Sequence, residues 1–303
     1  MHLQQLRTFV EVHRRRSISE AARMLGVTQP AVSQHIASLE AQIGKSLFER
    51  HARGVRPTAV ADDLAASLGT TLDSAEAALA SLRARSADVS GIVHIAAPAD
   101  YLAEAIAPRL PPLLAAGLEL RLHTGGRGTL YAMLLEDRAD LAITASLPDD
   151  PRLAFEPLGT ERLIAVAAPE LADRLARSDD LGAALADIPH IAYDLDRPLV
   201  RTWLIANDIA MPARLPAVTA PDLRVVRALL CNGDGWSVLP NYMCEDHIRS
   251  GLLTEIAPPI TTPENRFYLV WARSALRQPR IAFARDTLLA ALMGPSGAAL
   301  PAR

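Results

Sequence analysis

The chain has 303 residues, which is enough for two or three domains of ordinary size. Half of the residues are hydrophobic and 21% are charged, a balance typical of a folded protein with hydrophobic cores. No apolar run reaches the roughly 20 residues that a membrane helix needs, and the first segment lacks the pattern of a secretory signal. We therefore expect a cytoplasmic protein without a membrane partner.

Charge is distributed unevenly along the chain. Residues 1–58 carry a net charge of +5, so the remainder must carry -8 to give the total of -3. A small basic segment on an acidic body is typical of a DNA-binding module joined to a regulatory domain. An unevenly charged surface without any such role is the alternative at this point.

Two helices are predicted at the start of the chain. Apolar residues repeat at helical spacing through residues 3–13, and Ser17 followed by Glu20 has the S-x-x-E pattern of a capping box. That box opens a short helix, which Gly26 is expected to end by adopting the left-handed conformation.

A third helix is predicted to begin after Thr28, with Pro30 in its first turn. Its apolar positions form one seam, made of Val32, Ile36, Leu39 and Ile43. Two short helices joined by a tight glycine turn form a helix-turn-helix. Gln29 and Gln34 could then pair with base edges in the major groove, and Ser33 could reach phosphate. The alternative is a surface helix of a small bundle.

The segment KSLFERHARGVRPT, residues 45–58, is predicted to be a two-stranded wing. Leu47 and Phe48 anchor it, and Arg50, Arg53 and Arg56 bracket its turn. A basic tip of this kind can contact phosphates or the minor groove.

The stretch LxxFVEVxxxxSISEAARMLGVTQPAVSQHIASLEAQIGKSLFER resembles the winged helix-turn-helix of LysR-type transcriptional regulators. The match runs almost without gaps from Leu3 to Thr58, and departs from the family where Thr58-Ala59-Val60-Ala61 replaces a usual T-x-A-G. The DNA-binding residues expected here are Ser17, Thr28, Gln29, Pro30, Ala31, Ser33, Gln34, Ser38, Arg50, Arg53 and Arg56. The resemblance implies double-stranded promoter DNA and RNA polymerase as partners, in a bacterial, nucleoid-associated protein.

Residues 59–88 are expected to form a linker helix that pairs two copies of the chain. The seam consists of Leu64, Leu68, Thr71, Ala75, Ala78 and Leu82, spaced by three and four residues. The resemblance implies a homodimer or a homotetramer. A single helix packed on its own domain is the alternative.

Strand-like and helical runs alternate through residues 89–303, which predicts an α/β body with parallel sheets. The full fold class is an N-terminal all-α winged helix-turn-helix (1–58), a long linker helix, and a C-terminal α/β two-lobed effector domain. The resemblance implies that this domain is periplasmic-binding-protein-like, with CNGDGWSVLP as its best local match. We assign 89–161 and 267–303 to lobe I, and 162–266 to lobe II.

A small-molecule effector is expected between the lobes, because ligands of open α/β sheets lie beyond the carboxyl ends of the strands. The candidate residues are Pro98, Ala99, Asp100, Thr124, Gly125, Arg127, Thr129, Thr144, Ser146, Tyr193, Asp194 and Thr219. Arg127 in TGGRGT could hold a carboxylate, which makes an anionic effector one expectation, and a glycine turn with a solvated arginine is the other. Asp100 could hold a cation, although we expect it to cap the following helix.

Catalytic and metal-binding patterns were sought and not found. GKS at 44–46 lacks the first glycine of a phosphate loop, and G-x-S-x-G, H-E-x-x-H and C-x-x-C do not occur. Cys231 and Cys244 are expected to be reduced core thiols. We therefore expect no enzyme, no cofactor and no metal. The rival hypotheses are a cytoplasmic small-molecule receptor whose DNA-binding head is secondary, and an enzyme regulated through that head.

Overall fold

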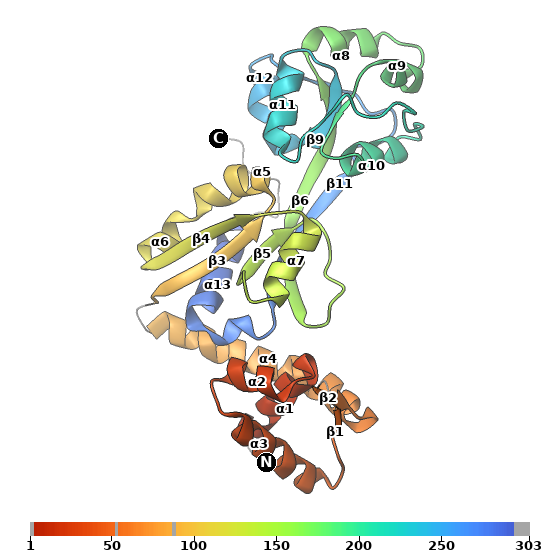
Figure 1. Ribbon diagram of the computed structural model, residues 1–303. Coiled ribbons are helices and arrows are strands. Elements are labelled where there is room, and N and C mark those ends of the chain that lie inside the picture. The colour runs from red at the N-terminus through yellow and green to blue at the C-terminus, as the bar shows by residue number, and fades with distance from the viewer. Residues whose placement is uncertain (1–2, 52–53, 87–88, 294–303) are drawn as a thin grey trace. The chain divides into compact units, whose positions relative to one another are not determined.

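The structure is a computed structural model, and it describes residues 3–51, 54–86 and 89–293 (Figure 1). Contacts divide it into two compact units, which are described in turn. Unit 1 consists of Met1–Ala87 and Arg273–Ala282, and unit 2 consists of Asp88–Ala272 and Phe283–Arg303.

Three helices open unit 1: α1 (Leu3–Arg15), α2 (Ile18–Leu25) and α3 (Gln29–Ile43). The Ser17 side chain accepts a hydrogen bond from the Glu20 N–H at 3.2 Å, and Thr28 accepts from the Ala31 N–H at 3.4 Å. Gly26 ends α2 with a φ of 65°. The caps and the glycine turn predicted from the sequence are therefore confirmed.

The predicted apolar seam of α3 forms the centre of the unit 1 core. Val32 and Leu39 are fully buried there, together with Phe9 of α1 and Leu47 of the following loop. Burying side chains of this size stabilises the fold by about 1.5–3 kcal/mol each. The core thus fixes which face of α3 remains outside.

The predicted wing is present as β1 (Phe48–His51) and β2 (Gly54–Pro57), an antiparallel pair. Gly54 has a φ of 136°, and a Cβ there would lie 2.5 Å from the Arg16 carbonyl oxygen. The neighbouring Val55 N–H donates to that same oxygen at 3.1 Å. Because only glycine allows this close approach, Gly54 attaches the wing to the turn between α1 and α2.

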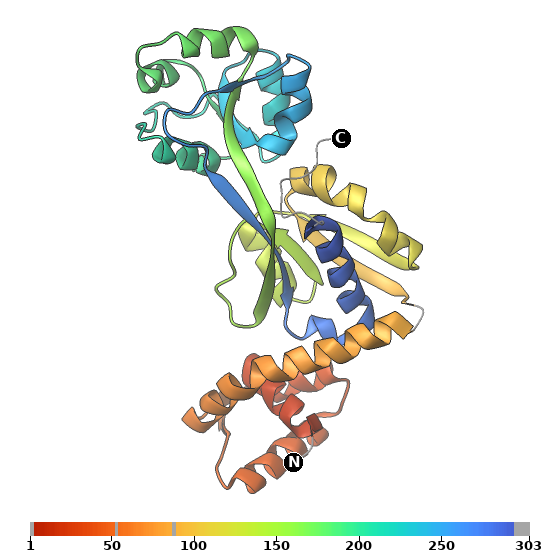
Figure 2. The ribbon, with the colours of Figure 1, turned by 180° about the vertical axis from the view of Figure 1, so that it is seen from behind.

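The predicted linker is one uninterrupted helix, α4 (Ala59–Ser86), drawn in orange in Figure 2. The Thr58 hydroxyl accepts a hydrogen bond from the Ala61 N–H at 3.3 Å and so caps its first turn. At 1.5 Å per residue the helix is about 40 Å long.

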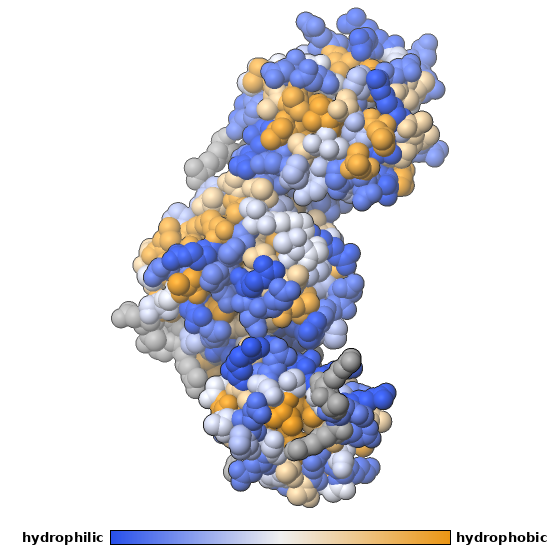
Figure 3. Space-filling view, in the orientation of Figure 1, coloured by the Kyte–Doolittle hydropathy of each residue, from blue (hydrophilic) through white to orange (hydrophobic). Residues whose placement is uncertain are grey.

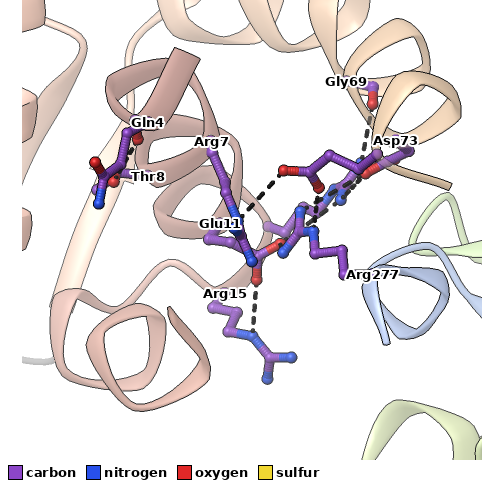
Figure 4. A network of polar contacts seen from close by, with 10 residues as sticks. Gln4, Arg7, Thr8, Glu11, Arg15, Gly69, Asp73 and Arg277 are labelled. Carbon is purple, nitrogen blue, oxygen red and sulfur yellow. Dashed lines mark hydrogen bonds and ion pairs between the residues drawn. The ribbon is translucent and has the colours of Figure 1, made fainter. Parts of the chain in front are cut away.

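A cluster of charged side chains is buried where α1, α4 and the 3₁₀ turn η3 (Ala275–Arg277) meet within unit 1 (Figure 4). Glu11 of α1 is only 1% exposed, and its carboxylate lies 3.0 Å from Arg277 and 3.5 Å from Arg15. Arg277 also pairs with Glu76, and Arg14 pairs with Asp73. This group is called the Glu11 cluster below.

Burial alone would lower the pKa of Arg277, but the carboxylates of Glu11 and Glu76 outweigh it and raise that pKa. Asp73, on α4, accepts a further hydrogen bond from Arg14 at 3.0 Å. A carboxylate as enclosed as Glu11 is costly unless it is paired. Arg277 pairs with Glu11 of α1 and with Glu76 of α4, so the three segments are held together.

Lobe I of unit 2 is built on parallel strands. They are β3 (Gly91–Ala97), β4 (Leu118–Thr124) and β5 (Leu141–Thr144), with β3 between the other two. The connecting helix after β3 is broken into α5 (Ala99–Tyr101), a π turn (Leu102–Ile106), a 3₁₀ turn (Ala107–Arg109) and α6 (Pro111–Ala115). Pro108, Pro111 and Pro112 account for the later breaks, because proline interrupts the helical hydrogen bonding. Helix α7 (Arg127–Leu135) follows β4.

Two strands run through both lobes, β6 (Leu153–Ala167) and β11 (Glu264–Ala272) (Figures 1 and 2). They pair antiparallel with each other, β11 pairs with β5 in lobe I, and β6 pairs with β9 (Trp236–Pro240) and β10 (Thr254–Ile256) in lobe II. The lobes are thus joined by hydrogen-bonded strands. The lobe limits given above stay a prediction.

Lobe II surrounds the far end of β6. Its other elements are α8 (Pro169–Ala176), α9 (Leu181–Asp187), β7 (Ile191–Ala192), α10 (Pro198–Ala206), β8 (Val218–Thr219), α11 (Leu223–Cys231) and α12 (Asn241–Arg249). Gly235 has a φ of 132°, and a Cβ there would lie 2.3 Å from the Pro189 carbonyl oxygen. This explains the second glycine of CNGDGWSVLP, because the chain must pass that carbonyl closely.

The last helix, α13 (Pro279–Met293), begins in unit 1 and continues in unit 2. Among the described residues, no helix is long and apolar enough to cross a membrane. On the face shown in Figure 3, hydrophobic residues form separate patches within a mostly hydrophilic surface.

Replacing Arg277 with Gln is expected to destabilise the full chain by about 2–4 kcal/mol, because it leaves Glu11 buried with fewer positive partners. Arg249→Gln is the matched control, since Arg249 forms an exposed pair with Asp246 at 2.7 Å that is worth about 0–1 kcal/mol. Urea unfolding measures both. Equal effects of the two substitutions would contradict the role given to the cluster.

Glu161 of β6 is 5% exposed, and burial raises its pKa to about 8. The folded chain therefore keeps a proton that the unfolded chain releases near 4.5, so stability falls as pH rises between about 4.5 and 8. Glu161→Gln removes the group whose burial lowers stability at high pH. It should raise the free energy of unfolding by on the order of 3 kcal/mol at about pH 8, with little change at about pH 5. Thermal unfolding over this range tests it, with exposed Glu156→Gln as the control. A pH-independent effect would contradict it.

Candidate nucleic-acid interface and effector loops

One face of α3 is left free by the packing of unit 1. Gln29, Pro30 and Gln34 are exposed on it, while Ala31 and Ser33 are half-buried at its edge. Each exposed glutamine side chain ends in an amide that carries both a carbonyl acceptor and an NH₂ donor. This is the arrangement that pairs with adenine in the major groove. The face therefore presents the hydrogen-bonding groups that a recognition surface needs.

Side chains on the flanks of α3 hold that face in place. Thr8 Oγ1 and His35 Nδ1 are 2.9 Å apart, and Gln5 donates to the Ser38 hydroxyl at 2.9 Å. Ser38, predicted as a DNA contact, is thus a half-buried link between α3 and α1. No sequence pattern pointed to His35 or Gln5, because each partner lies about 30 residues away along the chain.

Glu40, near the end of α3, is a second positioning residue that the sequence did not reveal. Its carboxylate accepts hydrogen bonds from the Leu47 N–H at 2.7 Å and the Phe48 N–H at 3.2 Å. A carboxylate that binds backbone N–H groups makes a strong, charge-assisted contact. Glu40 therefore sets the start of the wing relative to the recognition face.

The two predicted caps among the DNA contacts are Ser17 and Thr28. Each hydroxyl oxygen accepts a backbone N–H, so its own hydrogen remains available to donate to a phosphate. Arg56 is exposed on β2. The side chain of Arg50 and the whole of Arg53 lie outside the described residues.

In lobe I, the predicted effector loops lie together because β3, β4 and β5 are parallel and end at one edge of the sheet. The Gly125 N–H donates to the Ala97 carbonyl at 3.3 Å, which brings the TGGRGT loop to the end of β3 beside Pro98 and Ala99. At the end of β5, Thr144 is 3% exposed and accepts from the Ser146 N–H at 3.3 Å.

The side chain of Arg127, in the TGGRGT loop, already contacts an acidic and an aromatic residue. Its guanidinium lies 3.4 Å from Asp149 and 5.7 Å from the centre of the Tyr131 ring. Both groups of the ion pair are more than half exposed, so the pair is weak. Thr124 and Thr129 are exposed beside it.

In lobe II, β7 and β8 are parallel and end together. Tyr193 and Asp194 follow β7, where Asp194 accepts from the Arg197 N–H at 2.8 Å, and Thr219 at the end of β8 is exposed. Burial raises the pKa of Tyr193, and Asp100 of lobe I raises it further. The loops of the two lobes are thus close enough to interact electrostatically.

Asp100 lies in the first turn of α5 and is 5% exposed. The N-cap of that helix is Pro98, so the Asp100 side chain is not its cap. Burial raises the pKa of Asp100, while the N–H groups of residues 100 and 101 lower it and Asp222 of lobe II raises it. The expectation that Asp100 caps this helix is therefore wrong, because the residue lies inside the first turn, where its carboxylate is close to acidic side chains.

On the linker helix, Thr71, Ala75 and Ala78 are exposed. Leu64 packs against the core of unit 1, and Leu68 is half-buried. The side chain of Leu82 lies outside the described residues.

Within the described part of the chain, no group of three or more His, Cys, Asp or Glu side chains could hold a metal ion. A hollow of about 580 Å³ lies in lobe II between α8 and the loop before β9, lined by residues that include Glu170, Arg174 and Asp234. None of the predicted effector residues lines it. The effector site at the strand ends stays a prediction.

Two family models match the chain. The model of the bacterial regulatory helix-turn-helix protein, lysR family, matches residues 3–62, and that of the LysR substrate binding domain matches residues 86–293. The second match alone covers more than half of the chain.

Comparison with individual proteins gives the same family. The chain is 37% identical to the HTH-type transcriptional regulator AbaB of Streptomyces antibioticus over 297 residues, 95% of this chain and 97% of AbaB. Among solved structures it resembles CrgA, a LysR-type transcriptional regulator from Neisseria meningitidis, with a TM-score of 0.61, 22% identity, and coverage of 97% and 100% of the two chains. ArgP from Mycobacterium tuberculosis matches with a TM-score of 0.58, 23% identity, and coverage of 96% and 97%. The free recognition helix, its wing and the two-lobed body thus belong to a LysR-type transcriptional regulator, with a DNA-binding helix-turn-helix domain and an effector-binding domain.

Proposed function

We propose that the exposed face of α3 reads base edges in promoter DNA, with Gln29 and Gln34 as the residues that discriminate sequence. The observation that carries this proposal is the packing of α3, which buries Val32 and Leu39 and leaves both amides exposed. Ser17, Thr28, Ser33, Arg50, Arg53 and Arg56 would contact the phosphate backbone, which positions the helix but does not specify sequence.

Two copies of the chain would pair through α4, so that two heads bind two half-sites of an interrupted dyad. Support comes from the small exposed side chains of Thr71, Ala75 and Ala78, because small residues let two helices approach closely. Leu64 already packs against the core of unit 1, so the residues of α4 that pair the two copies would start after Leu64. We propose a homodimer or homotetramer that acts on the bacterial nucleoid and contacts RNA polymerase, without catalytic activity or a cofactor.

An effector between the lobes would change the spacing of the heads by favouring one arrangement of the lobes. Such a ligand is allosteric only if its affinity differs between the two arrangements. The strands β6 and β11 are the elements that would bend, because they alone among the described strands pass from one lobe to the other.

Gln34→Ala is expected to reduce discrimination between the operator and a mutated operator by about 1–3 kcal/mol, the value of a lost bidentate base contact. Fluorescence anisotropy with both duplexes measures it. Gln42→Ala is the control, because Gln42 is exposed on the same helix but lies two turns further from its N-terminus. If Gln34→Ala weakened both duplexes equally, base readout by this residue would be excluded.

Arg56→Gln is expected to weaken binding to every duplex alike and to reduce the slope of log affinity against log salt by about one, because one phosphate contact is lost. Arg138→Gln, an exposed arginine of unit 2 paired with Glu136 at 2.8 Å, should leave the slope unchanged. An unchanged slope for Arg56→Gln would show that this arginine does not touch phosphate.

A further inference from the structure

A carboxylate lies buried without a full set of partners where β6 and β11 pass between the lobes. Glu161 of β6 accepts a hydrogen bond from the Asn265 amide at 3.0 Å through Oε1. Its other oxygen, Oε2, is enclosed and has no hydrogen-bond partner among the described residues. The hydroxyl of Tyr242, at the start of α12, is likewise enclosed and unpartnered.

The strand register places these groups in one cluster. Asn265 is opposite Glu161, and Phe267, two residues further along β11, is on the same face. Phe267 stacks on Tyr101 of α5 with ring centres 3.9 Å apart, and Tyr101 meets the edge of the Tyr242 ring at 6.0 Å. Both lobes therefore contribute to the surroundings of Glu161.

The start of α12 is fixed over the same part of β6. The Asn241 side chain accepts from the backbone N–H of Arg162 at 3.0 Å, and Arg162 is the residue directly after Glu161. Tyr242 follows Asn241, and the charge of Glu161 raises the pKa of its hydroxyl, so the two groups are near enough to interact electrostatically. The contact of Asn241 with Arg162 thus fixes the backbone that carries the unpartnered hydroxyl.

The arginines around this cluster are engaged with other groups. Arg109, whose charge lowers the pKa of Tyr101, donates to the carbonyls of Ala105 at 2.7 Å and Ala291 at 3.1 Å. Arg227 of α11 lies 3.3 Å from Glu104, Arg224 lies 2.7 Å from Asp222, and Arg162 reaches Glu255 at 3.4 Å. Those pairs leave Glu161 without an ion pair to any arginine or lysine that the structure describes.

Asp100, also 5% exposed, adds a second negative group. Burial raises the pKa of Glu161 most, the hydrogen bond from Asn265 lowers it and the charge of Asp100 raises it, with a net pKa of about 8. Burial also raises the pKa of Tyr101 and of Tyr242, and the Glu161 charge adds to both increases. The cluster thus combines two buried acids, an unpartnered hydroxyl and aromatic rings, and no described arginine or lysine forms an ion pair with Glu161.

We propose that this cluster binds a small molecule that carries a cationic amine on an apolar or aromatic group. The ammonium would donate to Glu161 Oε2 and to the Tyr242 hydroxyl, and the apolar part would lie against the rings of Tyr101 and Tyr242. The inference rests on the proposed function, because it names the chemistry of the effector.

A cation fits this cluster better than the alternatives do. It satisfies both unpartnered oxygens, neutralises buried acids, and is attracted to the faces of aromatic rings. An anion would be repelled by Asp100 and by the ionised form of Glu161. The expectation of an anionic effector rested on Arg127, which is more than half exposed and lies 3.4 Å from Asp149. We therefore place the charged group of the ligand at Glu161 and not at the TGGRGT loop.

Proton release gives the proposal a distinctive signature. An ammonium binds the ionised form of Glu161, whereas the free protein holds a proton there below about pH 8. Affinity should therefore rise on the order of 50-fold between about pH 6 and about pH 8, with release of a proton on binding. A neutral ligand that accepts a hydrogen bond from the protonated acid would show the opposite trend.

Isothermal titration of the full-length protein with benzylamine, benzyl alcohol and benzoate tests the proposal, because the three probes share a shape and differ in charge. Benzylamine should bind in preference to the other two, more tightly at about pH 8 than at about pH 6. Glu161→Gln should abolish both the preference and the pH dependence, while Glu156→Gln, an exposed carboxylate on the same strand, should preserve both. Circular dichroism of each variant verifies that it is folded.

Equal or tighter binding of benzoate or benzyl alcohol would overturn the proposal, as would no binding of benzylamine, or an unchanged response in folded Glu161→Gln. Operator binding by the same preparations is measured separately. If DNA binds and benzylamine does not, the proposed function stands and the effector chemistry fails. If benzylamine binds and DNA does not, the site stands and its regulatory meaning fails.

Discussion

The organisation of unit 1 depends on a single buried carboxylate. Glu11 of α1 is 1% exposed and contacts Arg15 from its own helix and Arg277 from a segment more than 260 residues further along the chain. Its neighbours Asp73 and Glu76 belong to α4 and also contact Arg277. Because an unpaired charge in this position would be costly, the three segments adopt the arrangement that pairs it.

This arrangement has a consequence for regulation. Segment Arg273–Ala282 follows directly after β11, one of the two strands that cross between the lobes, yet it packs within the unit that carries the DNA-binding helices. A bend in β11 would therefore act on a segment whose ion pairs reach α1 and α4. The chain thus runs directly from β11, which carries Asn265 of the proposed effector cluster, to Arg277, which pairs with Glu11 of α1 and Glu76 of α4.

Local signals explain why much of unit 1 could be predicted from the sequence. Ser17, Gly26 and Thr28 act on backbone groups within four residues of themselves, so their effects do not depend on distant parts of the chain. The buried face of α3 could also be predicted from local sequence, because the period of a helix fixes which side chains share a face.

Features that depend on distant partners were not predicted. Strand β6 is 15 residues long, but Pro157 and Gly159 within it resemble a turn, and only pairing with β11 makes it one strand. Helix α12 was missed because its sequence, NYMCEDHIR, is mostly polar and short. Glu161 carried no signal either, since the groups around it come from three other elements, β11, α5 and α12. Ser38 accepts a hydrogen bond from Gln5, although it was expected to face DNA.

The central claim is that the exposed face of α3 reads a specific sequence in duplex DNA. Selection of bound duplexes from a random library by the purified full-length protein, at moderate salt and with benzylamine absent or present, tests it most directly. The account predicts enrichment of an interrupted dyad whose half-sites are separated by a whole number of helical turns. Recovery of duplexes with no shared sequence under either condition would contradict it.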